Sequence, residues 1–222
     1  MITGLHYNIM ANQDTSNLDT LLLDANGLLK VVPASVYAGI PWDKLRLWTH
    51  KRAVYGLPTT ELVEYLRRLI GGRRAIEIGS GNGCLGRSLG IPLTDNHLQT
   101  RPDVKVLYAL QGQPCIEYPP DVEKLDALEA VHKYHPQVVI GSWITQYSDG
   151  SRPGSIFGIH EETLLDIPGV EAYLMFGSIR NHEHKSICKR PHKVIQEIWM
   201  WSRADDSALF IWTQHPQRSP VK

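Results

Sequence analysis

Cysteine is scarce in this chain, and its spacing excludes most cysteine-based architectures. The 222 residues include only Cys84, Cys115 and Cys188, an odd number that contains no C-x-x-C pair. A disulfide framework and a zinc site are therefore not expected. Scattered free thiols are typical of a reducing compartment, so the sequence predicts a cytoplasmic protein.

The chain also lacks a long apolar run and an excess of charge of either sign. No apolar stretch approaches the roughly 20 residues of a membrane-spanning helix, and Met1–Met10 does not have the basic and apolar layout of a signal peptide. Twenty-three Lys and Arg residues balance 23 Asp and Glu residues. Strong non-specific binding to nucleic acid needs a basic field, so neither a membrane nor bulk nucleic acid is predicted as a partner. The sequence leaves the oligomeric state open.

What is present predicts one globular domain with an N-terminal extension. A chain of this length with 42% hydrophobic residues can bury a core without disulfides or metals. Residues 1–58 look irregular but carry Trp42, Trp48 and Tyr55, so we expect an N-terminal cap or lid on a main domain of residues 59–222. These rings either form a packing layer or face a substrate, and both alternatives stay open.

Helical and strand patterns alternate from Thr59 onward. Apolar residues recur at helical spacing between Thr59, a candidate N-cap, and the terminating Gly71. Strands are predicted over 75–78, 91–94, 137–140, 172–176 and 208–213, and helices over 84–89, 127–134 and 191–202; residues 104–110 suit a helix, 115–118 a short strand and 145–158 a loop. This alternation predicts an α/β fold, a doubly wound and mostly parallel sheet with helices on both faces.

The most informative stretch is Ala75–Gly83, which reads Ala-Ile-Glu-Ile-Gly-Ser-Gly-Asn-Gly. It joins a predicted strand to a predicted helix through a glycine-rich turn. Such a turn presents backbone N–H groups at the helix N-terminus, and its glycines let a ligand approach closely. The site therefore suits either a pyrophosphate or the carboxylate of an amino-acid-like cofactor.

Three interpretations of this turn compete. Gly81-x-Gly83-x-x-Gly86 formally matches the dinucleotide-binding G-x-G-x-x-G pattern, but its first glycine lies three residues past Ile78 rather than at the strand end. Read from Glu77, the turn is E-x-G-x-G-x-G, which resembles motif I of class I (Rossmann-like) S-adenosylmethionine-dependent methyltransferases. A glycine turn that holds no ligand is the third interpretation.

The methyltransferase resemblance covers about residues 60–145. Asp95 follows Gly79 by 16 residues, at the end of the next predicted strand, and Leu125-Asp126-Ala127 looks like the family's third motif. The resemblance implies S-adenosylmethionine as the cofactor, with Asp95 on the ribose hydroxyls and Asp126 near the adenine. The cofactor-binding residues that it implies are Glu77, Gly79, Ser80, Gly81, Asn82, Gly83, Asp95 and Asp126. For Glu77, a carboxylate that only orders the turn is the alternative.

The resemblance does not identify the methyl acceptor. Methyl transfer is an in-line displacement that needs alignment and, for some acceptors, removal of a proton, so the family has no universal catalytic residue. Gly141-Ser142-Trp143-Ile144 departs from the Asn/Asp-Pro-Pro-aromatic motif of adenine amino methyltransferases. Pro114-Cys115 precedes the third motif, so it does not match the nucleophile of cytosine-5 methyltransferases. The catalytic residue is unknown, and the candidates are Ser142, Trp143 and His160.

The predicted function is therefore an S-adenosylmethionine-dependent methyltransferase whose acceptor is a small molecule or a macromolecule. Trp143, at the end of the predicted fourth strand, suits a core aromatic as well as a substrate contact. A catalytically silent S-adenosylmethionine-binding or regulatory protein on the same fold is one alternative. A dinucleotide-dependent oxidoreductase is the other.

Two histidine groups and one basic run complete the candidates. His160-Glu161-Glu162 and His182-Glu183-His184 offer titratable side chains, but no fourth ligand suggests itself, so we predict solvated loops and no metal. The run Cys188–Lys193 is expected to be a solvated helix start, with a phosphate or nucleic-acid contact as the alternative.

Overall fold

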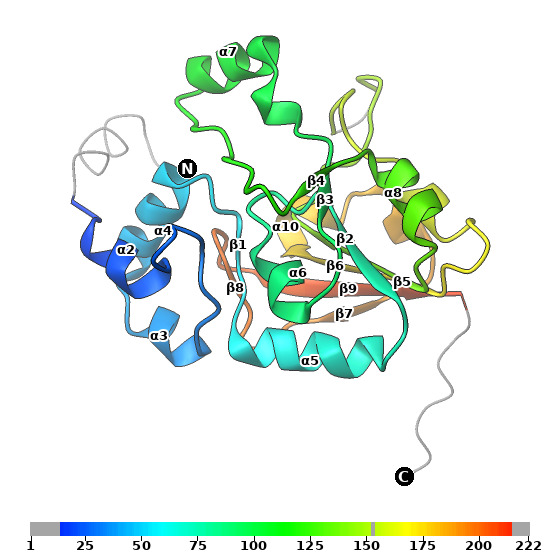
Figure 1. Cartoon of the computed structure of the whole chain (residues 1–222), viewed down its shortest axis with the longest axis horizontal. Helices are drawn as coiled ribbons and strands as arrows, with labels where there is room; N and C mark the ends of the chain where they lie inside the picture. Colours follow the sequence, from blue (N-terminus) through cyan, green and yellow to red (C-terminus); the bar gives the residue numbers. More distant parts are fainter. Residues whose placement is uncertain (1–13, 152–153, 215–222) are drawn as a thin grey trace.

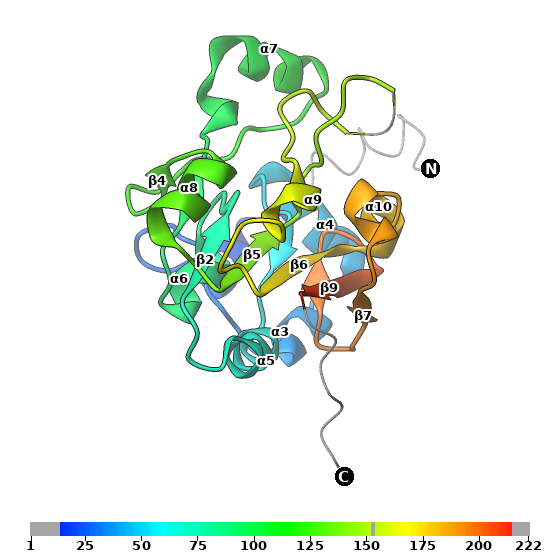
Figure 2. The same ribbon diagram turned by 90° about the vertical axis from the view of Figure 1, so that its right-hand side faces the viewer.

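The computed structural model describes residues 14–151 and 154–214. The predictions for Met1–Met10 and for Arg152 and Pro153 in the polar loop lie outside the described residues. Figure 1 shows one central sheet with helices packed against it and a group of short helices beside it, and Figure 2 shows the same arrangement turned by 90°.

The central sheet is mostly parallel. It contains, in spatial order, β2 (Ala75–Ile78), β5 (Val138–Ser142), β6 (Ala172–Ser178), β9 (Ser207–Thr213) and β7 (Lys193–Ile195). Strands β2, β5 and β6 run parallel, whereas β9 is antiparallel to both of its neighbours, β6 and β7.

A short parallel pair extends the sheet beyond β2. Strand β3 (Thr94–Asp95) pairs with β4 (Glu123–Lys124), and a parallel bridge joins Glu77 in β2 to Leu93, just before β3. The full order is therefore β4-β3-β2-β5-β6-β9-β7. Because the chain goes one way from β2 to β3 and the other way to β5, the carboxyl ends of β2 and β5 form the switch point where open α/β sheets bind ligands.

Helices cover both faces of the sheet, because side chains alternate along each buried strand. Helices α8 (Ala127–Tyr134) and α9 (Glu161–Leu164) pack on one face, and α5 (Thr60–Ile70) and α6 (Cys84–Leu89) pack on the other. The first face presents Ile76, Ile78, Val139, Tyr173, Met175, Phe210 and Trp212, and the second presents Ala75, Val138, Ile140, Leu174, Phe176, Leu209 and Ile211. The predicted doubly wound α/β fold is confirmed.

Helix α5 begins and ends where the sequence predicts. The Thr59 hydroxyl accepts a hydrogen bond from the Leu62 N–H at 3.1 Å, and Gly71 closes the helix with a left-handed φ of 60°. The strand and helix that enclose the glycine turn, β2 and α6, also match their predicted bounds.

The N-terminal segment is more regular than predicted. It contains α2 (Asn17–Leu22), α3 (Ala34–Ala38), α4 (Trp42–Lys51) and β1 (Gly56–Leu57), and β1 pairs with β8 (Trp201–Ser202). Its helices build a small core around Tyr37 and Trp48, which are fully buried, and Cys84 of α6 contributes to this core. Helices this short contain few turns, so their apolar residues repeat too few times to show a helical period. The sequence pattern therefore does not predict these helices. The division into residues 1–58 and 59–222 stays a prediction.

Two predicted elements are wrong. Residues 191–202 form β7, a turn and β8 instead of a helix. The β-branched Val194 and Ile195 pair with the edge of β9, and Ile198, expected on the helix, is 93% exposed. The short strand predicted over residues 115–118 is also wrong, because these residues are irregular. The strand that follows β3 along the chain is β4, at Glu123–Lys124.

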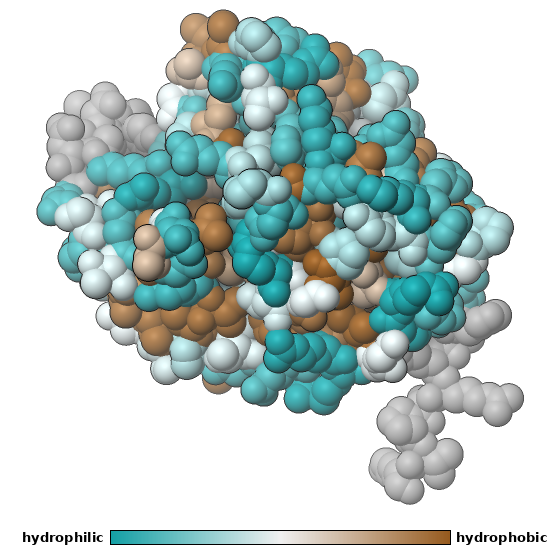
Figure 3. All heavy atoms as spheres, in the orientation of Figure 1, coloured by the Kyte–Doolittle hydropathy of each residue, from teal (hydrophilic) through white to brown (hydrophobic). Residues whose placement is uncertain are grey.

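Beyond β3 the chain forms a short 3₁₀ turn, Leu98–Thr100, and then α7 (Pro102–Leu110), which confirms the helix suited to residues 104–110. Both views show α7 standing away from the sheet (Figures 1 and 2). Its exposed apolar residues are Val106, Leu107 and Leu110, and Figure 3 shows apolar atoms gathered over this part of the molecule. No helix in residues 14–151 or 154–214 is both long and apolar enough to cross a membrane.

Candidate active-site cleft

The glycine turn between β2 and α6 depends on three left-handed glycines. Gly79, Gly81 and Gly83 have φ values of 56°, 55° and 71°, a region that residues with a Cβ rarely adopt. A Cβ at Gly79 would lie 2.5 Å from Cδ1 of Ile144. The turn therefore needs glycine for its backbone angles. Gly79 is needed in addition because Ile144, which follows β5, leaves no space for a Cβ.

Glu77 is buried and points into the protein rather than into solvent. Its side chain is 1% exposed, and Oε2 accepts a hydrogen bond from the Gly86 N–H at 2.9 Å. Burial raises the pKa of Glu77 to about 8, although the Gly86 hydrogen bond opposes the rise. This contact ties the end of β2 to the first turns of α6, which supports the ordering role among the two alternatives for Glu77.

Asp95 connects the glycine turn to the segment after β3. Its Oδ2 accepts from the Gly81 N–H at 3.0 Å, and its Oδ1 accepts from the His97 N–H at 2.9 Å. Burial raises the pKa of Asp95, while these backbone donors lower it. The Tyr118 side chain also hydrogen-bonds to this carboxylate. An ionised carboxylate accepts about four hydrogen bonds, so Asp95 keeps the capacity to accept one more from a ligand.

A cleft of about 1120 Å³, counted out to its open mouth, lies above the carboxyl ends of β2 and β5. Of the eight predicted cofactor-binding residues, it is lined by Glu77, Gly79, Ser80, Gly81, Asn82, Asp95 and Asp126. The eighth, Gly83, is the N-cap of α6, where a Cβ would meet Leu93 and Val122 at 3.0 Å. Its position is fixed by packing under the turn.

Asp126 stands at the rim of the cleft, at the start of α8. Its Oδ1 accepts from the Leu128 N–H at 2.9 Å, and its own N–H donates to Glu129 at 3.1 Å, which completes a capping box. The side chain is exposed. Asp126 therefore has a structural role in addition to any contact with a cofactor.

Five aromatic residues line the cleft. One of them, Tyr118, bonds to Asp95, and we call the other four, Tyr55, Tyr108, Trp143 and Phe157, the aromatic half. Tyr55 and Trp143 were named from the sequence, whereas Tyr108 in α7 and Phe157 in the loop after β5 were not. No sequence pattern links them, because they come from four separate segments and meet only in the folded chain.

Trp143 has an uncommon backbone conformation for its residue type. Its φ is 56°, directly after β5, and bulky residues rarely take left-handed angles outside functional or strained positions. Its ring lies 6.0 Å from the Tyr55 ring and meets His182 edge-on at 5.2 Å. The adjacent candidate Ser142 also lines the cleft. The third candidate, His160, does not line it and stacks on Tyr147 at 4.0 Å.

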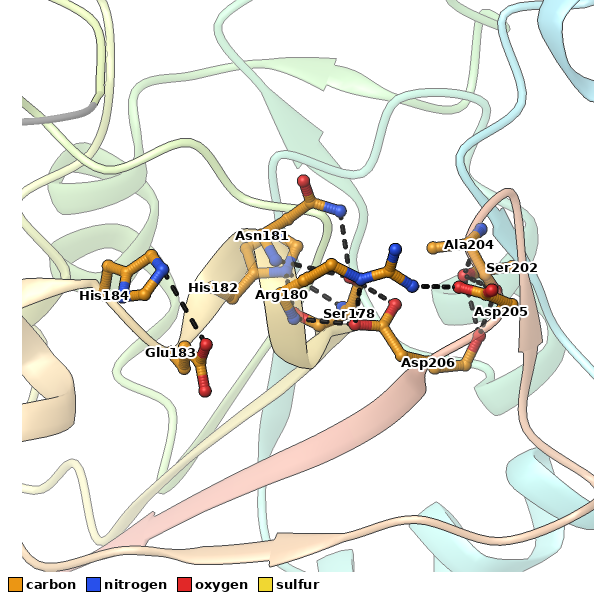
Figure 4. Close-up of polar contacts among 11 residues, drawn as sticks. Ser178, Arg180, Asn181, His182, Glu183, His184, Ser202, Ala204, Asp205 and Asp206 are labelled. Carbon is orange, nitrogen blue, oxygen red and sulfur yellow. Dashed lines mark hydrogen bonds and ion pairs between the residues drawn. The ribbon is translucent and has the colours of Figure 1, made fainter. Parts of the chain in front are cut away.

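Behind Trp143, α10 (Ile179–His182) holds His182 in a buried position. Figure 4 shows its ring turned back toward Ser178, where Nδ1 lies 2.9 Å from the backbone nitrogen. Ser178 in turn donates to Asp206 at 2.7 Å. Burial, with a contribution from Lys185, lowers the pKa of His182 to about 4, so this imidazole is neutral at neutral pH.

The solvated-loop prediction is therefore wrong for His182, and it is also wrong for Glu161. Glu161 is fully buried, and its carboxylate accepts from Lys185 at 2.8 Å and from the Tyr173 hydroxyl at 2.6 Å. A buried carboxylate that is paired with a lysine cannot be told from a solvated one by sequence alone. His184 is exposed, as predicted. Among the described residues, no three His, Cys, Asp or Glu side chains are grouped as a metal site.

The sequence matches no protein-family model, and no curated protein matches it. The fold is similar to that of solved proteins. The 23S rRNA methyltransferase ErmE is 17% identical over 70% of this chain and 68% of its own, with a TM-score of 0.37. An S-adenosylmethionine-dependent methyltransferase from Agrobacterium tumefaciens is 12% identical over 68% of this chain, which spans 60% of that chain, with a TM-score of 0.34.

The catalytic domain of hMettl16, solved in complex with the MAT2A 3'UTR hairpin 6, is 14% identical over 93% of this chain and 94% of its own, with a TM-score of 0.35. Solved S-adenosylmethionine-dependent methyltransferases are thus among the structures that this fold resembles. At these identities and TM-scores the likeness concerns the fold alone, and any function has to be inferred from the cleft itself.

Proposed function

We propose that the protein is an S-adenosylmethionine-dependent methyltransferase. The observation that supports this most is the position of Asp95, whose carboxylate lies in the cleft and accepts a hydrogen bond from Gly81 in the glycine turn. A carboxylate there suits the paired hydroxyls of a ribose, and the backbone of the turn suits an amino-acid carboxylate. The bound cofactor supplies a methyl group on a positively charged sulfur.

Two groups of residues line the cleft: the cofactor side, made of the glycine turn, Asp95 and Asp126, and the aromatic half. An acceptor held against the aromatic half would therefore lie in the same cleft as the cofactor. Alignment of this kind is the main contribution that an enzyme makes to an in-line displacement. In that displacement a lone pair of the acceptor forms the new bond to carbon, while the carbon–sulfur bond breaks and its electron pair stays on sulfur.

The sheet order disfavours the dinucleotide-dependent oxidoreductase. Dinucleotide-binding sheets take the strand order 3-2-1-4-5-6. Here the antiparallel strand β9 lies between β6 and β7, at the position where that order has none. The matching glycine pattern alone does not identify a cofactor.

A catalytically silent S-adenosylmethionine-binding protein remains the second candidate, and one observation favours it. The aromatic half contains no carboxylate or histidine, and the imidazole that contacts Trp143, that of His182, is bonded to Ser178. No side chain there is a ready general base. An acceptor atom that already carries a free lone pair needs none. A cytoplasmic location remains a prediction from the cysteine usage.

Calorimetric titration with S-adenosylmethionine and S-adenosylhomocysteine tests the proposal. We expect both to bind, and Asp95→Ala to weaken binding at least about tenfold, or about 1.4 kcal/mol. Asp166→Ala is the matched control, because Asp166 pairs with Arg190 outside the cleft. Absence of binding at millimolar cofactor would contradict the proposal. If NAD(H) or NADP(H) instead raised the melting temperature, the oxidoreductase would replace it.

A labelled-methyl assay separates enzyme from silent binder. The purified chain is incubated with methyl-labelled cofactor and with separate small-molecule, protein and nucleic-acid fractions of a lysate. Label in any fraction supports an active enzyme. Tight cofactor binding with no transfer to any of them would favour the silent protein.

A further inference from the structure

The two sets of lining residues differ in chemistry. The acidic residues of the cleft, Glu77, Asp95 and Asp126, all belong to the cofactor side, and each is already bonded to backbone donors. Burial keeps Glu77 protonated at neutral pH. The aromatic half supplies rings and hydroxyls and no carboxyl group, so these are what a guest held against it meets.

Arg203 places a positive charge next to the aromatic half. Its backbone N–H donates to the Tyr55 carbonyl at 2.9 Å, and its guanidinium stacks over the Tyr55 ring at 4.6 Å. The side chain is half-buried, and no carboxylate in the part of the chain that the structure describes forms an ion pair with it. The exposed Arg52, Arg180 and Arg190, by contrast, all pair with aspartates.

The charge of Arg203 reaches the cleft at Tyr108. Burial raises the pKa of Tyr108 to about 12, and the Arg203 charge acts in the opposite direction. A hydrogen bond with the Tyr55 side chain also contributes to the rise. The Tyr108 hydroxyl therefore stays protonated at neutral pH as a hydrogen-bond donor beside this guanidinium.

A cage of aromatic rings can in general bind either a cation or a flat ring. Here two of the four rings already face guanidinium groups, Tyr55 that of Arg203 and Phe157 that of Arg101 at 4.9 Å. Asp103 pairs with Arg101, whereas Arg203 has no carboxylate partner among the described residues, so a cationic guest beside Tyr55 would be repelled. The Trp143 Nε1–H, which is buried and has no acceptor among the described residues, adds a donor and no negative charge.

We propose that the aromatic half is a subsite for a small planar aromatic molecule that carries an anionic group, the ring lying against Tyr55 and Trp143 and the anion lying toward Tyr108 and Arg203. This molecule is the acceptor class that we propose for the methyltransferase. Its role in methyl transfer rests on the proposed function, whereas its binding does not. The same chemistry comes from two sources, an aromatic carboxylic acid or a nucleoside monophosphate.

Binding to the full chain is measured by calorimetry with matched probes. The acid pair is 4-hydroxybenzoate and its neutral isostere 4-hydroxybenzamide, with tyramine as the cationic member, and the nucleotide pair is adenosine monophosphate and adenosine. We expect the anion of at least one pair to bind about fivefold tighter than its neutral partner, which corresponds to about 1 kcal/mol from a partly screened charge. Tyramine is expected to bind weakest. The pair that shows the preference identifies the source.

The variants Arg203→Gln and Arg68→Gln locate the charge that is responsible. Arg68 is the matched control, because its guanidinium also lies over a tyrosine, Tyr65, at 5.7 Å, but outside the cleft. Arg203→Gln is expected to abolish the anion preference and to leave S-adenosylhomocysteine affinity within about twofold. Arg68→Gln is expected to change neither.

The outcomes that overturn the inference differ from those that overturn the proposed function. Equal binding of anion and neutral partner, tighter binding of tyramine, no binding by any probe, or an anion preference that survives Arg203→Gln would each overturn the subsite. If S-adenosylhomocysteine fails to bind but the anion preference depends on Arg203, the methyltransferase proposal fails alone.

Discussion

The two sides of the cleft are built in different ways. The cofactor side comes mainly from one short stretch, Ala75–Gly83, whose backbone angles need glycine, and from Asp95 at the end of β3, which accepts a hydrogen bond from that stretch. The aromatic half is assembled from side chains of four distant segments, supported by His182 and Arg203. Backbone geometry is encoded locally, whereas a side-chain surface depends on how the whole chain packs.

The difference extends to the buried titratable group behind each side. Glu77, under the glycine turn, is an acid that burial keeps protonated, and His182, under Trp143, is a base that burial keeps neutral. Both avoid a buried charge, so pH affects them in opposite directions. Replacing Glu77 or His182 should therefore show which of the two groups lowers the free energy of unfolding above neutral pH and which lowers it below neutral pH.

The largest expected effect comes from Glu77 at alkaline pH. Its folded-state pKa of about 8 exceeds the reference 4.5, so the folded chain holds this proton more tightly than the unfolded chain. The stabilisation is complete below about pH 4.5 and is lost as pH rises through about 8, by up to about 5 kcal/mol. Urea unfolding at pH 5, 7 and 9 should show the wild type losing stability relative to Glu77→Gln. The neighbouring charges that modulate this effect are Asp95 and Arg87.

Glu64→Gln, at an exposed position of α5, is the control for the Glu77 measurement and should stay parallel to the wild type. A difference between wild type and Glu77→Gln that does not change with pH would contradict this account of the cofactor side.

His182 should give the opposite dependence. Its folded-state pKa of about 4 lies below the reference 6.5, so the unfolded chain takes up a proton that the folded chain refuses. The wild type should lose up to about 3 kcal/mol relative to His182→Gln as pH falls from about 6.5 to 4. Lys185 adds to this loss and Asp206 opposes it. His184→Gln, at an exposed histidine, should not alter the pH dependence, and an equal effect there would refute the prediction.

Gly86→Ala tests the packing under the glycine turn. A Cβ at Gly86 would lie 2.4 Å from Cδ2 of Leu93 and 2.7 Å from Oε2 of Glu77, so we expect a loss of about 2–3 kcal/mol in the free energy of unfolding. Gly90→Ala is the comparison, because Gly90 has a φ of 72° but open space around it. It should cost only about 1 kcal/mol of backbone strain. Equal losses in urea unfolding would show that packing against Glu77 is unimportant.

Asp126 gives the smallest effect and separates its two roles. Asp126→Ala removes the cap of α8 and should cost about 1 kcal/mol of stability, whereas Asp126→Ser keeps a capping hydroxyl and should cost little. If the carboxylate also binds the cofactor, both variants weaken S-adenosylhomocysteine binding equally in calorimetry. Unchanged affinity in Asp126→Ser would restrict Asp126 to the cap.

Much of the fold could be predicted because its signals are local. The period of α5, its cap at Thr59, and the strand–glycine–helix sequence from β2 to α6 all depend on neighbouring residues. The helix predicted over residues 191–202 is wrong because the spacing of Val194 and Ile195 also suits one face of a helix. In the structure these residues pair with the edge of β9, a later segment of the chain, and form a strand. The short strand β4 was missed for the same reason, since only β3 defines it.

The candidate site likewise contains residues that local sequence predicts and residues that only the fold brings together. Seven of the eight residues expected to bind the cofactor line one cleft, because the turn and Asp95 end adjacent strands. Burial of His182 and Glu161, and the stacking of Arg203 on Tyr55, depend on contacts between segments far apart in the chain. No pattern in the sequence predicts contacts between segments that lie far apart in the chain.

The sequence by itself determined the α/β alternation and the glycine turn with its following carboxylate, since backbone angles and periodic burial are local properties of the chain. Only the tertiary structure decided that Tyr55, Tyr108, Trp143 and Phe157 line one cleft, and that the Arg203 guanidinium lies over the Tyr55 ring. Those contacts arise when the N-terminal segment, α7 and the β8–β9 turn meet above the sheet. Their free energy comes from packing between segments whose order along the chain does not reveal their distance in space.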